Sequence, residues 1–187
     1  DSVERMEEAT WIDGILRGEG EDSFDDFLAY LAGEATAEKV AGLVYRSGDK
    51  ILANPMKGPL LMEGFPVGYN EEDLNHRIVY YESMRGCPYH CSYCLSSEDD
   101  VVRYRSAEEI KTHMGRIFRT GTNLVKFVDR SFHIRPDRTK EILRFFIDEA
   151  PKEMCIHFEM NLEHMTSDVA ELINEAPAGR FQIEAGI

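Results

Sequence analysis

Three of the chain's four cysteines lie within eight residues, in the stretch CPYHCSYC. The spacing C-x3-C-x2-C allows one loop to point Cys87, Cys91 and Cys94 at a single centre. Three thiolates can hold three corners of a cubane iron–sulfur cluster and leave one iron without a protein ligand. Catalytic metal sites keep such an open position, whereas structural sites fill it. The spacing therefore indicates iron–sulfur chemistry with one open coordination position.

Other uses of a thiol cluster stay open at this point. A structural zinc site needs four nitrogen or sulfur ligands; His90 is the available fourth, but adjacent residues such as His90 and Cys91 rarely reach one ion with good geometry. A two-cluster ferredoxin motif requires a fourth Cys followed by Pro, which LSSEDD does not provide. A disulfide with one spare thiol is the simplest alternative. Cys155, far along the chain, is typical of a small buried apolar residue, with a fourth-ligand role as the other interpretation.

Composition narrows the class of partner. The 187 residues carry a formal net charge of −14, which argues against nucleic acid and anionic membranes as partners. No apolar run approaches the roughly 20 residues needed to cross a bilayer, and DSVERMEEATW at the start lacks the basic-then-apolar pattern of a signal peptide. Four cysteines without such a signal argue against a disulfide framework. We therefore expect a cytoplasmic protein.

The first part of the chain has the pattern of a small α/β unit. TWIDGILRGEGEDSFDDFLAYLAGE predicts a short strand, a turn and a helix with Ser23 as its N-cap. Four apolar residues of that helix fall on one face: Phe24, Phe27, Leu28 and Leu31. Two short strands around the turn SGDK follow. We assign residues 1–54 to this unit and residues 55–76, which begin with a Pro- and Gly-rich stretch, to a linker.

Strand and helix patterns alternate from Arg77 onward. RIVYYESM predicts a strand that runs into the cysteine loop, and NLVKFVD, CIHFEM and RFQIEAGI predict three more. A capping box of Ser106 and Glu109 starts the first helix, and further helices are expected over residues 137–149 and 167–176. This alternation predicts a parallel α/β sheet or barrel.

The number of strands falls short of a complete barrel. Four strands with three intervening helices do not close a barrel of eight units, and no helix follows the last predicted strand. We therefore expect residues 77–187 to be part of a larger α/β domain; the family resemblance described below implies that they are the N-terminal part of a TIM-like (βα) barrel. The chain, which does not start with Met, is then expected to be a fragment of a longer protein.

CPYHCSYC resembles the signature C-x3-C-x-aromatic-C of the radical SAM superfamily, with Tyr93 at the aromatic position. KFVDRSF, HFEMN and FQIEAGI, on the next three predicted strands, are similar to the branch that contains the anaerobic magnesium-protoporphyrin ester cyclases. Members of that branch usually carry an N-terminal cobalamin-binding domain, and the resemblance implies that residues 1–54 are a remnant of such a domain. The base-off cobalamin motif D-x-H-x-x-G is absent, so cobalamin is expected only in the full-length protein.

The resemblance implies a definite chemistry. Such proteins bind a [4Fe-4S] cluster whose fourth iron is chelated by the amino and carboxylate groups of S-adenosylmethionine. Reductive cleavage yields methionine and a 5′-deoxyadenosyl radical, which abstracts hydrogen from a substrate, while the protein positions the cofactors and excludes water and oxygen. The implied partners are a substrate that the sequence does not identify and a flavodoxin- or ferredoxin-like electron donor.

The resemblance also carries roles to individual residues. Cys87, Cys91 and Cys94 would ligate the cluster, and Tyr93 would lie beside the adenine, chiefly through backbone contacts. Further cofactor contacts are expected at the C-terminal ends of the following strands, as in barrel enzymes generally.

Four charged residues occupy those strand ends. Asp129 and Arg130 end the second strand, where many relatives have Gly-Gly-Glu against the methionine amino group and this chain has VDRSF. Glu159 matches a position where relatives place a carboxylate against the amino or ribose groups, and Glu184 is a further candidate on the fourth strand. A surface ion pair is the simplest alternative for Asp129 and Arg130. Arg85 is interpreted either as a contact of the cysteine loop or as a capping or salt-bridge residue.

Two alternatives to a working radical enzyme remain. The first is a non-catalytic iron–sulfur or zinc module in which the cysteine loop is structural. The second is a relative that has kept the cluster and lost turnover. Iron with acid-labile sulfide, against a single zinc, would separate the enzyme from a zinc module.

Overall fold

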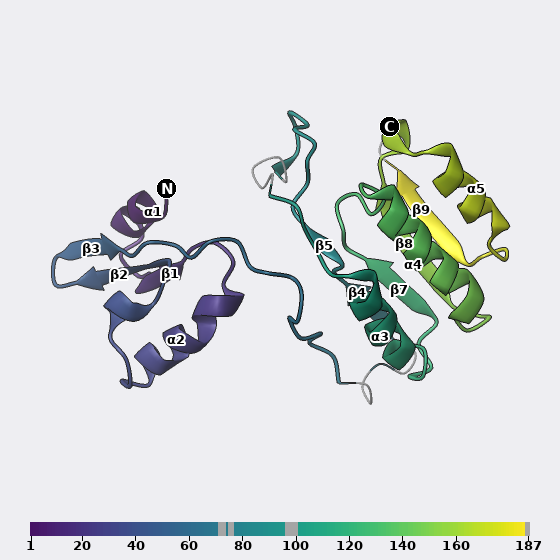
Figure 1. The fold of residues 1–187 in the computed structure, drawn as a ribbon. Helices are drawn as coiled ribbons and strands as arrows, with labels where there is room; N and C mark the ends of the chain where they lie inside the picture. The colour runs from purple at the N-terminus through teal and green to yellow at the C-terminus, as the bar shows by residue number, and fades with distance from the viewer. Residues whose placement is uncertain (71–73, 75–76, 96–100, 186–187) are drawn as a thin grey trace. The chain divides into compact units, whose positions relative to one another are not determined.

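The computed structural model describes residues 1–70, 74, 77–95 and 101–185. The chain divides into two compact units, Asp1–Leu60 and Leu61–Ile187 (Figure 1), and each has a hydrophobic core of its own. The division lies inside the predicted linker 55–76. The described part of that segment has neither helix nor strand, but Val67 and Tyr69 pack against the core of the second unit.

The first unit is built on an antiparallel sheet of three strands. Its elements are α1 (Ser2–Glu8), β1 (Gly14–Leu16), α2 (Glu21–Leu31), the 3₁₀ helix η1 (Ala37–Lys39), β2 (Leu43–Ser47) and β3 (Lys50–Ala53). The strand order is β1-β2-β3. The predicted hairpin around SGDK is confirmed by the pairing of Ser47 with Lys50, and Val40, Leu43 and Tyr45 lie in the core.

Helix α2 differs from its prediction at its start and on its apolar face. Gly20 occupies the N-cap position, and Ser23 lies buried inside the helix, so the N-cap prediction was wrong. Two acidic residues in the first turn favour the earlier start because they complement the helix dipole. Phe27 packs against the core, whereas the other three residues of the predicted face are largely exposed: Phe24, Leu28 and Leu31.

The second unit has the predicted alternation of strands and helices. Its elements are β4 (Ile78–Tyr81), β5 (Met84–Arg85), β6 (Arg103–Tyr104), α3 (Ala107–Ile117), β7 (Leu124–Phe127), α4 (Pro136–Glu149), β8 (Cys155–Met160), the 3₁₀ helix η4 (Leu162–His164), α5 (Ser167–Glu175) and β9 (Phe181–Ala185). Four strands form a parallel sheet in the order β4-β7-β8-β9. Helices α3, α4 and α5 cover one face (Figure 1). This chain-ordered sheet with helices on one side is the wall of a (βα) barrel, and it confirms the predicted partial barrel.

The predicted strand RIVYYESM is two strands in the structure. β4 ends at Tyr81, and β5 pairs antiparallel with β6 in a separate sheet of two strands. The break falls where the Asp129 carboxylate accepts hydrogen bonds from the backbone N–H groups of Ser83 and Met84. The base of the cysteine loop therefore lies outside the parallel sheet.

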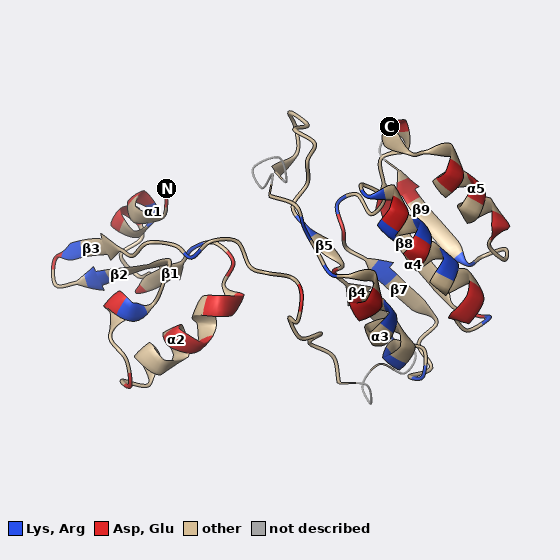
Figure 2. Ribbon diagram, viewed as in Figure 1, with Lys and Arg blue, Asp and Glu red and all other residues tan. Residues whose placement is uncertain are grey.

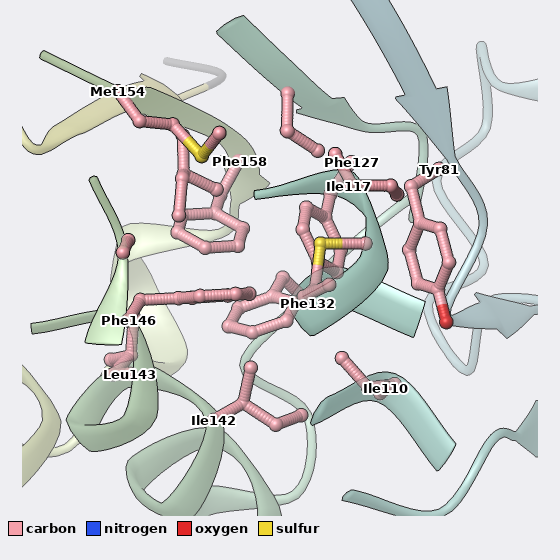
Figure 3. Close-up of a cluster of buried hydrophobic side chains, with 14 of the residues drawn as sticks. Tyr81, Ile110, Ile117, Phe127, Phe132, Ile142, Leu143, Phe146, Met154 and Phe158 are labelled. Carbon is pink, nitrogen blue, oxygen red and sulfur yellow. The ribbon is translucent and has the colours of Figure 1, made fainter. Parts of the chain in front are cut away.

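An aromatic cluster forms the centre of the second core. Residues that alternate along the strands point to the helices, among them Phe127 of β7 and Phe158 of β8. The Phe158 ring stacks on Phe132 with centroids 4.1 Å apart and contacts Phe127 at 5.0 Å (Figure 3). Phe146 of α4 joins the cluster at 5.8 Å from Phe127.

The helices are apolar toward the sheet and charged on the outside. Figure 2 shows Lys, Arg, Asp and Glu interleaved along α4. Ion pairs join neighbouring helices: Lys111–Glu141 at 2.7 Å, Lys140–Asp168 at 2.6 Å and Arg144–Glu175 at 2.7 Å. Such exposed pairs contribute little each, so the core supplies most of the stability. Among the described residues, no helix is long and apolar enough to cross a membrane.

We predict that Phe158→Ala lowers the free energy of unfolding of the second unit by about 3–5 kcal/mol, because it empties a fully buried aromatic position. Denaturant titration followed by near-UV circular dichroism measures the loss. Leu162→Ala, at a position 54% exposed, is the control and should change stability by less than about 0.5 kcal/mol. A loss below about 1 kcal/mol at Phe158 would contradict the assigned core.

Candidate functional site

The cysteine loop is the segment of the second unit between β5 and β6, which begins at Gly86. Met84 pairs with Tyr104 and Arg85 with Arg103, so the two short strands close the base of the loop. The side chain of Cys87 is buried, while Cys91 and Cys94 are half-buried. The fold therefore holds the first cysteine in place and leaves the other two near the surface.

The donor set fits an iron–sulfur cluster. None of the four cysteines, all of which are described, takes part in a disulfide in this structure. Three thiols in one loop are the ligands that cubane clusters use. In the described part of the chain, no three His, Cys, Asp or Glu side chains are arranged to hold a metal ion, so ligation would require the sulfurs to converge on binding.

Gly86 sets the direction in which the chain enters Cys87. Its φ is +88°, a conformation that residues with a side chain rarely adopt. A β-carbon at this position would also lie 2.5 Å from the carbonyl oxygen of Val101. The turn into the first cysteine therefore requires glycine.

A second contact holds the cysteine loop against the end of β8. Tyr89 stacks on His164 of η4 with ring centroids 4.9 Å apart and planes 8° from parallel. Burial raises the pKa of the Tyr89 hydroxyl above its ordinary value, and the flat contact of its ring with His164 anchors the loop. The loop is thus attached both to its own base and to the end of a neighbouring strand.

A cleft of about 480 Å³ opens beside the base of the loop, within the usual range for small-molecule sites. Its lining residues are Glu82, Met84, Arg85, Gly86, Val128, Arg130 and Glu159. Glu82, Val128, Arg130 and Glu159 lie at the carboxyl ends of β4, β7 and β8, the edge where barrel enzymes carry their sites, and the other three lining residues belong to β5 and the turn after it. The cleft therefore brings together two of the predicted cofactor residues, Arg130 and Glu159, next to the start of the cysteine loop.

The two arginines of the cleft differ in their surroundings. Arg85 forms a two-point ion pair with Glu82, with Nε–Oε1 at 2.9 Å and Nη2–Oε2 at 2.6 Å. This confirms the salt bridge considered for Arg85 from the sequence. The charge of Arg85 is thus balanced within the wall, whereas Arg130 is an exposed residue on the lining.

Asp129 lies behind the wall of the cleft instead of on it. The side chain is 1% exposed, and its oxygens accept hydrogen bonds from Ser83 and Met84. Burial raises the pKa of this carboxyl to about 6, against an ordinary value near 3.8, and the hydrogen bonds from Ser83 offset part of that rise. A surface ion pair with Arg130 does not fit so buried a group, and direct contact with a cofactor stays a prediction that these surroundings do not favour.

Tyr93 and Glu184, the remaining predicted cofactor residues, lie outside the cleft lining. Tyr93 is 87% exposed on the cysteine loop. Glu184 is paired in register with Glu159, and its Oε2 lies 3.1 Å from Nε2 of the buried His157. Their cofactor roles stay predictions.

Cys155 lies at the opposite end of the sheet from the cysteine loop. It starts β8, whereas the loop emerges at the carboxyl edge. Burial raises the pKa of its thiol, which disfavours the thiolate that ligates metals. Cys155 is half-buried, less than expected of a buried apolar residue, and the structure does not bring it to the other three.

Sequence reasoning missed the residues that support the site from behind. Arg138 of α4 donates to the Ser83 carbonyl at 2.9 Å and to Ser83 Oγ at 2.8 Å, and neither residue stood out in the sequence. Gly86 carried a usable signal because it is a glycine directly before the first cysteine. Ser83 and Arg138 carried none, because they are 55 positions apart and meet only in the fold.

Comparison with protein families identifies the class. The profile described as the Radical SAM superfamily matches residues 81–185, which is more than half of the chain and includes the cysteine loop, the cleft and strands β7, β8 and β9 of the parallel sheet. The chain belongs to the radical SAM superfamily.

Sequence relatives include methyltransferases and a cyclase. An uncharacterised methyltransferase of Pyrococcus horikoshii is 26% identical over 73% of this chain and 32% of its own length. The anaerobic magnesium-protoporphyrin IX monomethyl ester cyclase of Cereibacter sphaeroides is 33% identical over 48% of this chain and 16% of its own length. The cobalamin-dependent radical SAM methyltransferase TokK of Streptomyces tokunonensis is 24% identical over 91% of this chain. The chain thus spans a third or less of these relatives.

Solved structures share the fold. The cobalamin-dependent S-adenosylmethionine radical enzyme OxsB superposes over 100% of this chain and 30% of its own length, with a TM-score of 0.71 and 16% identity. The radical S-adenosylmethionine methyltransferase TsrM of Kitasatospora setae superposes over 96% of this chain and 38% of its own, with a TM-score of 0.70 and 15% identity.

We predict that Gly86→Ala destabilises the second unit more than a matched glycine substitution does. Gly179→Ala imposes positive φ alone, because its φ is +81° with nothing within 4 Å of an added β-carbon, and should cost about 1–2 kcal/mol. Gly86→Ala adds a clash with backbone atoms and should cost at least about 1 kcal/mol more. Thermal unfolding of both variants measures the difference, and equal losses would show that the loop base has no steric requirement for glycine.

We predict that Asp129 makes stability fall as the pH rises. Its folded pKa of about 6 lies above the ordinary value of 3.8, so between these values the native state holds a proton that the unfolded state has released. The contribution of Asp129 is therefore full below about pH 4 and is lost as the pH passes 6. The difference in unfolding free energy between wild type and Asp129→Asn should decline from pH 4 to pH 7 by at most about 3 kcal/mol. A difference that grew over this range would contradict the raised pKa.

Proposed function

We propose that this chain is the cofactor-binding part of an enzyme that reductively cleaves S-adenosylmethionine. The observation that carries the proposal is a C-x3-C-x2-C loop at the carboxyl edge of a parallel sheet, beside a cleft lined by Arg130 and Glu159. When bound, a [4Fe-4S] cluster and S-adenosylmethionine supply the one-electron cleavage that yields a 5′-deoxyadenosyl radical. Membership of the radical SAM superfamily supports the proposal.

Cys87, Cys91 and Cys94 would hold the cluster through their thiolates, the form of cysteine that ligates metals. Cys87 would keep its present place because Gly86 and the β5–β6 pair fix the entry to the loop. Cys91 and Cys94, which are less buried, would move to complete the set.

Arg130 and Glu159 would bind the polar end of S-adenosylmethionine. Glu159 would accept hydrogen bonds from the amino or ribose groups, and the Arg130 guanidinium would donate to the carboxylate, as charge-assisted pairs of this kind do. The partly enclosed cleft strengthens both interactions relative to open water. Tyr93, through its backbone, would lie beside the adenine, and Glu184 is the next carboxylate along the same edge.

The remaining parts of the reaction would come from other molecules and other segments. A flavodoxin- or ferredoxin-like protein would supply the electron. Relatives are named for methyl transfer and for ring closure, and the chain spans a third or less of their length. We therefore assign the choice of substrate, and any binding of cobalamin, to the full-length protein.

EPR spectroscopy of anaerobically reconstituted, dithionite-reduced protein tests the proposal. We expect about four irons per chain and a cubane signal that shifts when S-adenosylmethionine is added, because an open iron takes the ligand. Cys87→Ala, Cys91→Ala and Cys94→Ala should each abolish the signal. Cys155→Ala should leave the iron content unchanged and is the matched control.

Glu159→Gln tests the cleft separately from the cluster. The variant should keep its iron but require roughly tenfold more S-adenosylmethionine for the same spectral shift, the effect of losing one charged hydrogen bond. Iron retained in the triple cysteine variant would contradict the proposal. One zinc per chain in place of iron would instead indicate a structural metal module.

A further inference from the structure

The buried carboxylate of Asp129 closes the junction between β4 and β5. Its Oδ1 accepts hydrogen bonds from the backbone N–H of Ser83 at 2.7 Å and of Met84 at 3.1 Å, and its Oδ2 accepts one from the Ser83 hydroxyl. Ser83 is fully buried and Asp129 nearly so. Both carboxylate oxygens are therefore committed to the chain four residues before Cys87.

Two arginines join the other end of the cysteine loop to the same point. The Ser83 carbonyl accepts hydrogen bonds from the Arg105 backbone N–H and from Arg138 Nη2, both at 2.9 Å. Arg138 Nε also donates to the Arg105 carbonyl at 3.1 Å. Ser83 precedes the loop and Arg105 follows it, so Asp129, Ser83, Arg105 and Arg138 form one clamp at its base.

The segment after β7 connects this clamp to the cleft. Arg130, the residue after Asp129, lines the cleft. The backbone N–H of Phe132 donates to the Glu159 carbonyl at 3.0 Å. The chain from Asp129 to Phe132 thus sets the base of the cysteine loop, Arg130 and Glu159 relative to one another.

We propose that Asp129 is a positioning residue: its carboxylate acts through Ser83 and Met84 to fix where Cys87 lies relative to Arg130 and Glu159. The proposal rests on the proposed function, in which this loop holds the cluster. It differs from the role expected from the sequence, because Asp129 would support the site from behind and make no contact with S-adenosylmethionine.

A matched control lies at the other end of the same strand. The Thr122 hydroxyl, just before β7, donates to the carbonyl of Arg77, just before β4, and Thr122 is 4% exposed. Thr122 and Asp129 therefore tie the same two strands at opposite ends. Thr122→Val should destabilise the unit without altering the base of the cysteine loop.

Thiol labelling of the metal-free full chain, resolved for each cysteine by mass spectrometry, tests the proposal. At a temperature where every variant is folded, Asp129→Ala should speed maleimide modification of Cys87 about tenfold relative to Cys155, because the clamp opens locally. Asp129→Asn, which keeps one oxygen as acceptor for the two N–H groups, should show a smaller increase and serves if the Ala variant does not fold. Thr122→Val should leave the ratio unchanged.

The second readout uses reconstituted protein. Asp129→Ala should lower the iron content and broaden the EPR signal relative to Thr122→Val, when the two variants are compared at equal folding stability. Unchanged Cys87 labelling in both Asp129 variants would overturn the proposal. So would an Asp129→Asn variant with normal labelling and iron that no longer responds to S-adenosylmethionine, since that pattern marks direct contact. Labelling needs no cluster, so its outcome is separate from any failure of the proposed function.

Discussion

Where β4 ends, two buried backbone N–H groups need an acceptor, and the carboxylate of Asp129 provides it. Each unsatisfied buried donor would cost about 1–3 kcal/mol, so the chain can leave the parallel sheet at Ser83 only because this acceptor is present. The rest of the site depends on that junction. The β5–β6 pair, the Gly86 turn and the wall of the cleft all follow from where Ser83 and Met84 are held.

One face of the parallel sheet packs against the helices and forms the core, and the other face contributes to the cleft. On β8, Phe158 points to the helices and joins the aromatic cluster (Figure 3), while Glu159, the next residue, lines the cleft. Successive strand residues point to opposite faces, so a carboxylate can follow a fully buried ring at no cost to the core. The same alternation places Glu184 beside Glu159 across the β8–β9 pair.

Local patterns predicted the elements well, and they failed where distant segments decide the outcome. Ser106 is confirmed as the N-cap by the hydrogen bond from the Glu109 N–H to Ser106 Oγ at 3.2 Å, and the strands from NLVKFVD onward lie where period and composition placed them. The reciprocal half of the capping box is not formed, because Glu109 Oε1 accepts from Gly64 N–H and Arg105 instead. Two-residue β6 is too short to show any alternation. The burial of Asp129 could not be predicted, because its partner Ser83 lies 46 positions earlier in the chain.

Asp129 and Arg130 lie on different sides of the cleft wall, and their position after a strand is not enough to predict which side each one faces. Both follow β7, and the period of two no longer applies once the strand has ended at Phe127. Hydrogen bonding decides instead: the junction at Ser83 draws Asp129 inward, and Arg130 then lines the cleft. Under the proposed function, the carboxylate of Asp129 is committed to the loop base, so a carboxylate for the amino group would come from the neighbouring strand, where Glu159 lines the cleft.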